Sequence, residues 1–178
     1  MALGVGLFAQ ARTPAATTRN DKILIQGNAA GTQTVQIDAA GAARAEYSYN
    51  DRGRGDHIIA TWKLDAAGVP SEYEGRGNDY MKAPIEERFE IQNGKARWKN
   101  RSEHGERATT GEAFYVPANP PPEFAGVLAR ALLKAPGHKP SLLPAGEASI
   151  EESGKVSVDG ASGKVGIAQD RFLDLTSG

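Results

Sequence analysis

The sequence predicts a mainly β fold, a curved antiparallel meander of about seven to nine strands. We expect a half-barrel or incomplete barrel with one amphipathic helix packed on its concave face. Three observations lead to this fold class. Short segments rich in β-branched and aromatic residues recur, turn signals separate them, and one later segment has helical periodicity. The 178 residues suffice for one domain with a core, but not for two large domains.

Strand-like segments follow one another from the start of the expected domain. They span residues 23–26, 32–37, 44–49, 58–64 and 69–74. The tetrapeptide Asp-Ala-Ala-Gly occurs twice between them, at 38–41 and at 65–68. Asp can cap such a turn, and Gly can adopt the left-handed conformation that ends it. The repeated turn predicts that consecutive strands are antiparallel neighbours.

Residues 85–101 form the clearest hairpin. Asn93-Gly94 separates two alternating segments and favours a type I′ two-residue turn. This turn sets a register in which both faces of the ribbon agree: Phe89 opposes Trp98 and Ile91 opposes Ala96 on one face, while Glu90 opposes Arg97 and Glu86 opposes Arg101 on the other.

One amphipathic helix is predicted at 122–134. Its apolar residues recur at i, i+3, i+4, i+7 and i+8: Phe124, Val127, Leu128, Ala131 and Leu132. Glu123 lies in the first turn and Lys134 in the last, and Pro136-Gly137 ends the helix. Such a helix must bury its apolar stripe, and the concave face of the sheet is where we expect it.

Three regions are predicted along the chain. Residues 1–21 read as a signal-peptide remnant and linker, because the apolar run 2–9 is followed by the small-x-small pattern Ala9-Gln10-Ala11. Residues 22–152 form the β-rich domain, and 153–178 form a weakly structured tail with a weak strand or two. The run is too short to span a bilayer. We therefore expect a secreted or periplasmic protein without a transmembrane segment.

The composition argues against several classes of function. Lys plus Arg number 21 and Asp plus Glu 22, and the two signs interleave along the chain, so we expect no nucleic-acid partner. Without Cys there is no thiolate zinc site. The three histidines are far apart in sequence, and no nucleophile elbow or phosphate-binding glycine loop occurs. We predict no catalytic residue, metal ligand or cofactor in this chain.

Two polar loops supply the candidate binding residues. The first contains Asp51, Arg52 and Arg54, whose guanidinium groups could clamp a carboxylate or phosphate. The second contains Asp79, Tyr80 and Lys82, which offer an acid, a phenol and an amine to a pocket. Both loops can equally be structural connections: acidic residues flank the arginines, and Pro84 favours an extended or turn conformation before it.

Several motifs resemble one protein family. Residues 47–55 read Tyr-Ser-Tyr-Asn-Asp-Arg-Gly-Arg-Gly, residues 77–84 read Gly-Asn-Asp-Tyr-Met-Lys-Ala-Pro, and residues 142–148 read Leu-Leu-Pro-Ala-Gly-Glu-Ala. Together they make residues 22–150 similar to the amino-terminal region of exported bacterial amidohydrolases of the imidazolonepropionase-like group. The resemblance implies a β-rich segment that precedes a metal-dependent barrel hydrolysing C–N bonds. Such a barrel needs roughly 250 residues and opens with a His-x-His metal pair, and this sequence has neither.

From the resemblance we expect a non-catalytic amino-terminal accessory domain of a secreted metal-dependent amidohydrolase. Its expected partner is the catalytic domain of the same polypeptide, which would hold the metal. The alternative is a periplasmic binding or carrier module for an apolar small molecule. Its groove would be lined by aromatic and aliphatic residues that serve equally well as a plain core: Trp62, Phe89, Trp98, Phe114, Phe124 and Leu128.

Overall fold

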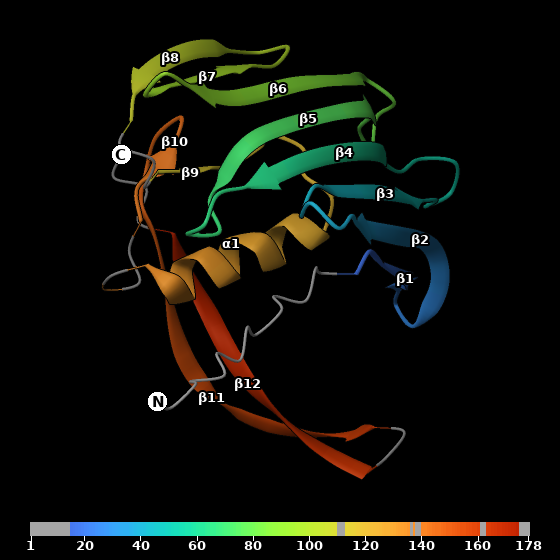
Figure 1. The fold of residues 1–178 in the computed structure, drawn as a ribbon. Coiled ribbons are helices and arrows are strands. Elements are labelled where there is room, and N and C mark those ends of the chain that lie inside the picture. Colours follow the sequence, from blue (N-terminus) through green and yellow to red (C-terminus); the bar gives the residue numbers. More distant parts are fainter. Residues whose placement is uncertain (1–14, 110–112, 136, 138–139, 161–162, 175–178) are drawn as a thin grey trace, which may run out of the picture.

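An eight-stranded antiparallel meander forms the body of the protein. The computed structural model describes residues 15–109, 113–135, 137, 140–160 and 163–174. Strands pair in chain order: β1 (Thr17–Ile25), β2 (Asn28–Ile37), β3 (Ala43–Tyr49), β4 (His57–Leu64), β5 (Pro70–Asn78), β6 (Pro84–Gln92), β7 (Lys95–Lys99) and β8 (His104–Ala108). The sheet is curved and does not close into a barrel (Figure 1). The predicted fold class is confirmed.

The second half of the chain returns beneath the sheet. Helix α1 (Glu123–Lys134) lies across the concave side (Figure 1), and β9 (Phe114–Tyr115) pairs in parallel with β10 (Leu142–Leu143). A long hairpin of β11 (Ala148–Gly160) and β12 (Gly163–Asp174) then projects from the body. No helix in the described ranges is long and apolar enough to cross a membrane.

Helix α1 packs on the concave face of the sheet through the ring of Phe124. The ring makes edge contacts with Trp62 on β4 and Tyr73 on β5, at centroid distances of 5.5 and 5.1 Å. A row of small residues crosses the same face, with Ala45 opposite Ala60 and Ala60 opposite Gly75. The small side chains leave room on the face that the helix covers. The predicted burial of the helix stripe is confirmed.

A residue of β2 caps the first turn of α1. Pro122 at the N-cap makes no side-chain cap hydrogen bond. Instead Gln33, which is 4% exposed, accepts a hydrogen bond from the Glu123 N–H at 3.0 Å. Its amide nitrogen donates to Asp21 on β1, and Arg19 forms ion pairs with both Asp21 and Glu123. The start of the helix is thus bonded to the β1–β2 edge of the sheet.

The predicted hairpin register is confirmed where the ladder extends. Phe89 opposes Trp98, Glu90 opposes Arg97, and Asn93 and Gly94 have φ of 52° and 71°, as a type I′ turn requires. The predicted pairing of Glu86 with Arg101 is absent from the β6–β7 ladder, whose last pair is Arg88–Lys99. Arg101 lies beyond the end of β7 and donates to the carbonyl of Pro84 at 3.0 Å.

The repeated tetrapeptide forms the same turn twice. Oδ1 of Asp38 accepts hydrogen bonds from the N–H groups of Ala40 and Ala42, at 2.8 and 2.9 Å. Asp65 makes the equivalent pair of bonds in its own turn. Gly41 and Gly68 have φ of 84° and 86°, so each takes the predicted left-handed position.

Both ends of the domain carry more strand than expected. Residues 17–21, expected as linker, belong to β1, because their backbone finds ladder partners along β2 from Ile37 to Gln33. Residues 153–174, expected as weakly structured tail, belong largely to the β11–β12 hairpin, whose pairing ends at Gly160–Gly163. The apolar run 2–9 and its cleavage pattern lie outside the described residues.

Replacing Phe124 by Ala should lower the free energy of unfolding by about 3–5 kcal/mol, because it empties the contact between helix and sheet. Leu133→Ala is the matched control on the same helix, since Leu133 is 51% exposed. Its effect should stay within about 0.5 kcal/mol. Urea unfolding followed by tryptophan fluorescence measures both variants. Equal losses would show that α1 is not anchored through Phe124.

Candidate functional site

The two predicted polar loops meet at one end of the sheet. Residues 50–56 connect β3 to β4, residues 79–83 connect β5 to β6, and both connections lie at the same end of the antiparallel strands. The backbone N–H of Gly55 donates to the carbonyl of Tyr80 at 3.3 Å, which joins them directly. The structure therefore brings together candidates that are far apart in sequence.

Three side-chain hydrogen bonds fasten one loop to the other. Tyr80 Oη donates to Asp51 Oδ2 at 3.1 Å, and Lys82 Nζ donates to the carbonyl of Gly55 at 2.9 Å. Asn78 donates to the same carbonyl at 3.2 Å. The phenol, the amine and one carboxylate of the predicted site thus have partners within the loops.

Asp79 shapes its own loop. Its Oδ1 accepts the N–H groups of Met81 and Ala83, each at 2.9 Å, as Asp38 and Asp65 do in their turns. The fourth position of this turn is Lys82, whose φ is 66° where the other two turns have glycine. A residue with a side chain is unfavourable in the left-handed region. Lys82 therefore donates its hydrogen bond to Gly55 from a strained backbone conformation.

The interior of this loop pair is partly shielded from water. Burial raises the pKa of the Asp56 carboxyl; the nearby Asp79 carboxylate raises it further, and Lys82 opposes the shift. Burial, and then the charge of Asp56, also raise the pKa of Tyr49. The Tyr49 ring stacks on Tyr80 at 6.4 Å. The acids here therefore disfavour each other's charge, and the hydrogen bonds of Tyr80 and Lys82 hold together the loops that carry them.

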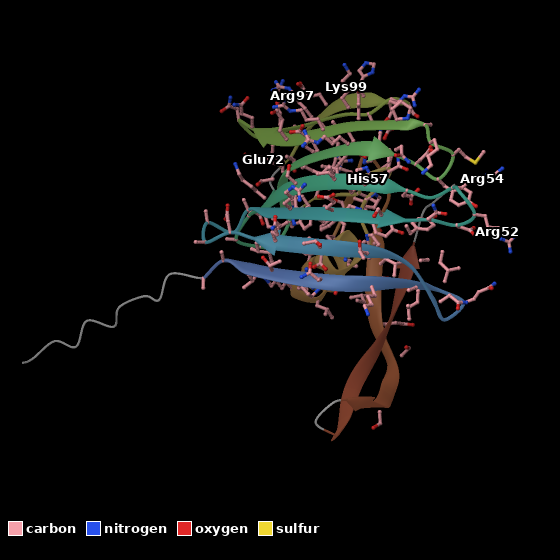
Figure 2. The ribbon with its side chains drawn as sticks, turned by 90° about the vertical axis from the view of Figure 1, so that its right-hand side faces the viewer. Arg52, Arg54, His57, Glu72, Arg97 and Lys99 are labelled. Atoms are coloured by element: carbon pink, nitrogen blue, oxygen red, sulfur yellow. The ribbon has the colours of Figure 1, made fainter. Side chains whose placement is uncertain are left out.

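The two predicted arginines point away from this cluster (Figure 2). Arg52 and Gly53 have φ of 54° and 88° at the tip of a tight turn closed by Asp51 and Arg54. Both guanidinium groups are exposed, and neither forms an ion pair within the described part of the chain. Asp51 accepts a hydrogen bond from Tyr80 rather than from either arginine.

Comparison with known proteins adds no family to this geometry. No family model, no curated protein and no solved structure matches the chain. In the described residues, no three side chains of the types His, Cys, Asp and Glu gather closely enough to hold a metal ion. His57 has one acidic neighbour, Glu46, at 3.7 Å.

Glu87 is a buried carboxylate that sequence analysis did not single out. It points into the core with 5% exposure while Glu86 points to solvent, as strand alternation requires. Its Oε1 accepts hydrogen bonds from Tyr115 Oη at 2.6 Å and from the Ala118 N–H at 2.9 Å. This carboxylate fastens the segment before α1 to the sheet. An acidic residue at an inward strand position was the signal that could have revealed it.

Two tyrosines surround that carboxylate. Burial raises the pKa of Tyr73, and burial together with the hydrogen bond to Glu87 raises that of Tyr115, so both phenols stay protonated at neutral pH. Tyr115 also stacks on Phe89 at 4.2 Å. Tyr73 Oη and Glu87 Oε2 are buried and have no hydrogen-bond partner among the described residues. The polar part of the core is therefore incompletely satisfied.

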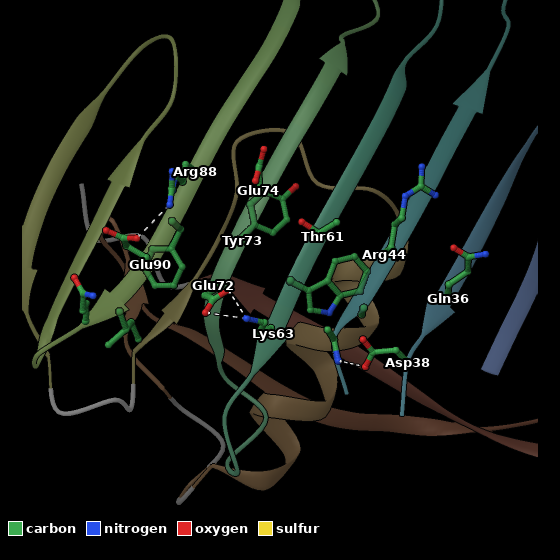
Figure 3. Close-up of a pocket in the computed structure, with 16 residues that line it drawn as sticks. Gln36, Asp38, Arg44, Thr61, Lys63, Glu72, Tyr73, Glu74, Arg88 and Glu90 are labelled. Atoms are coloured by element: carbon green, nitrogen blue, oxygen red, sulfur yellow. Dashed lines mark hydrogen bonds and ion pairs between the residues drawn. The ribbon is translucent and has the colours of Figure 1, made fainter. Parts of the chain in front are cut away.

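The outer face of the sheet is hollowed and charged (Figure 3). A hollow of about 550 Å³ crosses β2 to β6, and the ion pairs Lys63–Glu72 and Arg88–Glu90 lie within it, at 2.9 and 3.5 Å. A second hollow of about 1270 Å³ lies over β5 to β8. Neither was expected, because the aromatic residues of the sequence favoured a ligand on the concave face.

Substitutions at Lys82 separate backbone strain from the ammonium bond. Lys82→Met should lose about 0.5–1.5 kcal/mol of unfolding free energy with the hydrogen bond to Gly55, while the strain remains. Lys82→Gly loses the same bond but relieves the left-handed side chain, so it should be more stable than the Met variant by about 1 kcal/mol. Urea unfolding measures the difference. A Gly variant that is less stable than the Met variant would show that the left-handed backbone at Lys82 is not strained.

Removing one phenolic oxygen at a time should distinguish the two buried tyrosines. Tyr115→Phe should lower the unfolding free energy by about 1–3 kcal/mol, because the buried Glu87 then loses one of its two hydrogen-bond donors and keeps only the Ala118 N–H. Tyr73→Phe makes the same chemical change where the oxygen has no partner, so stability should change by less than about 0.5 kcal/mol or rise. Thermal and urea unfolding test both. Similar losses would mean that Tyr73 Oη has a partner in solution.

Proposed function

We propose that this chain is a non-catalytic amino-terminal accessory domain of a secreted metal-dependent amidohydrolase. The family part of the proposal rests on the sequence resemblance over residues 22–150. The metal and the hydrolytic residues would belong to the catalytic domain of the same polypeptide, which is the proposed partner. The part played by this chain rests on the arrangement of its loops and strands.

The observation that carries the non-catalytic role is how the candidate polar groups are used. Tyr80 bonds to Asp51, Lys82 to a backbone carbonyl, and Asp79 to two N–H groups of its own turn. A catalytic acid, base or nucleophile must be free to reach a substrate atom. These groups instead hold two loops in one conformation, which is what a rigid scaffold requires.

The β11–β12 hairpin supports attachment to a further domain. Its first residues belong to the core, since Ala148 and Ile150 are 6% and 5% exposed, and β11 contacts α1. Beyond them the hairpin projects from the body (Figure 1), and within the described residues its strands pair with each other alone. A two-stranded hairpin is marginally stable by itself in water. We infer that the catalytic domain covers it.

The packing gives less support to a carrier for an apolar ligand. That alternative needs the aromatic side chains of the concave face to line an open groove. Trp62, Phe89, Phe114 and Phe124 are at most 4% exposed. Phe124 contacts two of the neighbouring rings on the sheet and also Phe114. These four residues form core, and the other two candidates, Trp98 and Leu128, are partly buried against it, which favours the accessory role.

The purified chain should hydrolyse no amide or imide substrate and bind no stoichiometric zinc, because its polar loop groups are engaged. Turnover assays with added zinc and metal analysis after dialysis check this. Asp51→Asn and Lys82→Met are the diagnostic variants. Turnover that survives purification and is abolished by either change would place a catalytic site in these loops and refute the proposal.

Hydrogen exchange tests the attachment role of the hairpin. In the isolated chain, the amides of β11 beyond Ile150 and those of β12 should exchange far faster than those of the central strands β4 and β5, because no domain covers the hairpin. Strands of the same chain serve as the internal control. Equal protection of hairpin and central sheet would show that the hairpin needs no partner.

A further inference from the structure

We propose that the outer face of β6, β7 and β8 binds a phosphate group carried by a larger ligand, with Lys99 at the centre of the site. Every second residue along β7 and just beyond it is basic: Lys95, Arg97, Lys99 and Arg101. Arg97 and Lys99 project outward from the sheet (Figure 2). The larger hollow of the outer face is lined by Arg97, Lys99 and Arg101, together with Arg88 and His104.

The pairing of the strands surrounds Lys99 with bases. Arg88 on β6 is its partner on one side, and His104 on β8 is its partner on the other. Side chains opposite each other in a sheet lie close together, and the positive charges of Arg88 and Lys99 in this position are destabilising. Packing does not require this arrangement, because all three side chains point to solvent. An anion placed between them would turn the repulsion into attraction.

The acidic residues of this surface leave Lys99 without a partner. Glu106 is shared by Lys95 and Arg97, each at 2.7 Å, and Glu90 lies 3.5 Å from Arg88. Glu74 and Glu86 line the same hollow on β5 and β6. The Lys99 ammonium forms no ion pair or hydrogen bond within the residues that the structure describes. It is available to a ligand.

The donor set fits a tetrahedral dianion. Arg88 can bind two phosphate oxygens with its planar fork, while Lys99 adds a point charge and a donor. His104 adds a further donor through its ring. The hollow of about 1270 Å³ leaves room beside a phosphate group for the rest of a larger ligand. This inference does not depend on the accessory role, and either can fail without the other.

Titration with inorganic pyrophosphate at constant ionic strength tests the site by calorimetry and by thermal shift. Wild type should show saturable binding and a raised melting temperature. Lys99→Gln and Arg88→Gln should each weaken binding by about tenfold, the loss expected for one charge-assisted hydrogen bond. Without ligand, Lys99→Gln should melt at the same temperature as wild type or higher, because the repulsion is relieved.

Lys63→Gln is the matched control. It removes one lysine from the same face, but Lys63 pairs with Glu72 and does not line the larger hollow. Pyrophosphate should bind this variant as it binds wild type, and vesicles containing phosphatidic acid distinguish a lipid headgroup from a soluble phosphate ester. Binding to either probe that depends on Lys99 supports the site. Absence of saturable binding to both probes, or equal losses in Lys63→Gln and Lys99→Gln, overturns it.

Discussion

The sheet has one apolar face, and covering that face is the constraint on which the rest of the structure depends. The ring of Phe124 meets Trp62 and Tyr73 there and brings helix α1 onto the strands. Burying a side chain of this size stabilises a protein by roughly 1.5–3 kcal/mol. Because the helix follows the sheet in the chain, the segment between them must be fastened as well. Glu87 does this by accepting hydrogen bonds from Tyr115 and Ala118.

Several polar side chains in this fold accept hydrogen bonds from backbone N–H groups in turns and at the start of the helix. Gln33 satisfies an N–H group at the start of α1 that its own N-cap leaves free. Asp38, Asp65 and Asp79 each accept two N–H groups within their turns. Isolated polar groups would be costly in or near the core, whereas these are stabilising because they have partners. For the same reason, the polar residues predicted as a binding site in the two loops mostly form hydrogen bonds within those loops.

The two faces of the sheet follow different rules. On the concave face, small, aliphatic and aromatic residues pack against the helix, and the acids Asp21 and Glu87 each accept hydrogen bonds. On the outer face, charges alternate in sign across most strands, and ion pairs such as Lys63–Glu72 follow from that pattern. Glu72 and Glu90 also oppose each other, but each has a basic partner, Lys63 or Arg88. Around Lys99, three bases are neighbours across β6, β7 and β8. A departure from charge alternation is informative because nothing in the packing requires it.

The local elements of this protein were determined by its sequence. Strand alternation, the Asn93-Gly94 turn and the helical period of 122–134 depend on residues within one or two turns of each other, and these predictions are confirmed. The register of Phe89 with Trp98 also placed Arg88 beside Lys99, although the basic cluster becomes evident only when β8 adds His104.

Tertiary structure alone decided the contacts between distant segments. Gln33 caps a helix 90 residues away, and Tyr80 reaches Asp51 across 29 residues of chain. No local pattern of residue types encodes such partners, because each depends on where the whole sheet places its edges. For the same reason, residues 17–21 form a strand, because β2 lies beside them and supplies backbone hydrogen-bond partners. The sequence by itself determined the central strands, their turns and the helix. The tertiary structure decided the strand at both ends of the domain and which polar groups meet, because both depend on partners that only the completed sheet brings close.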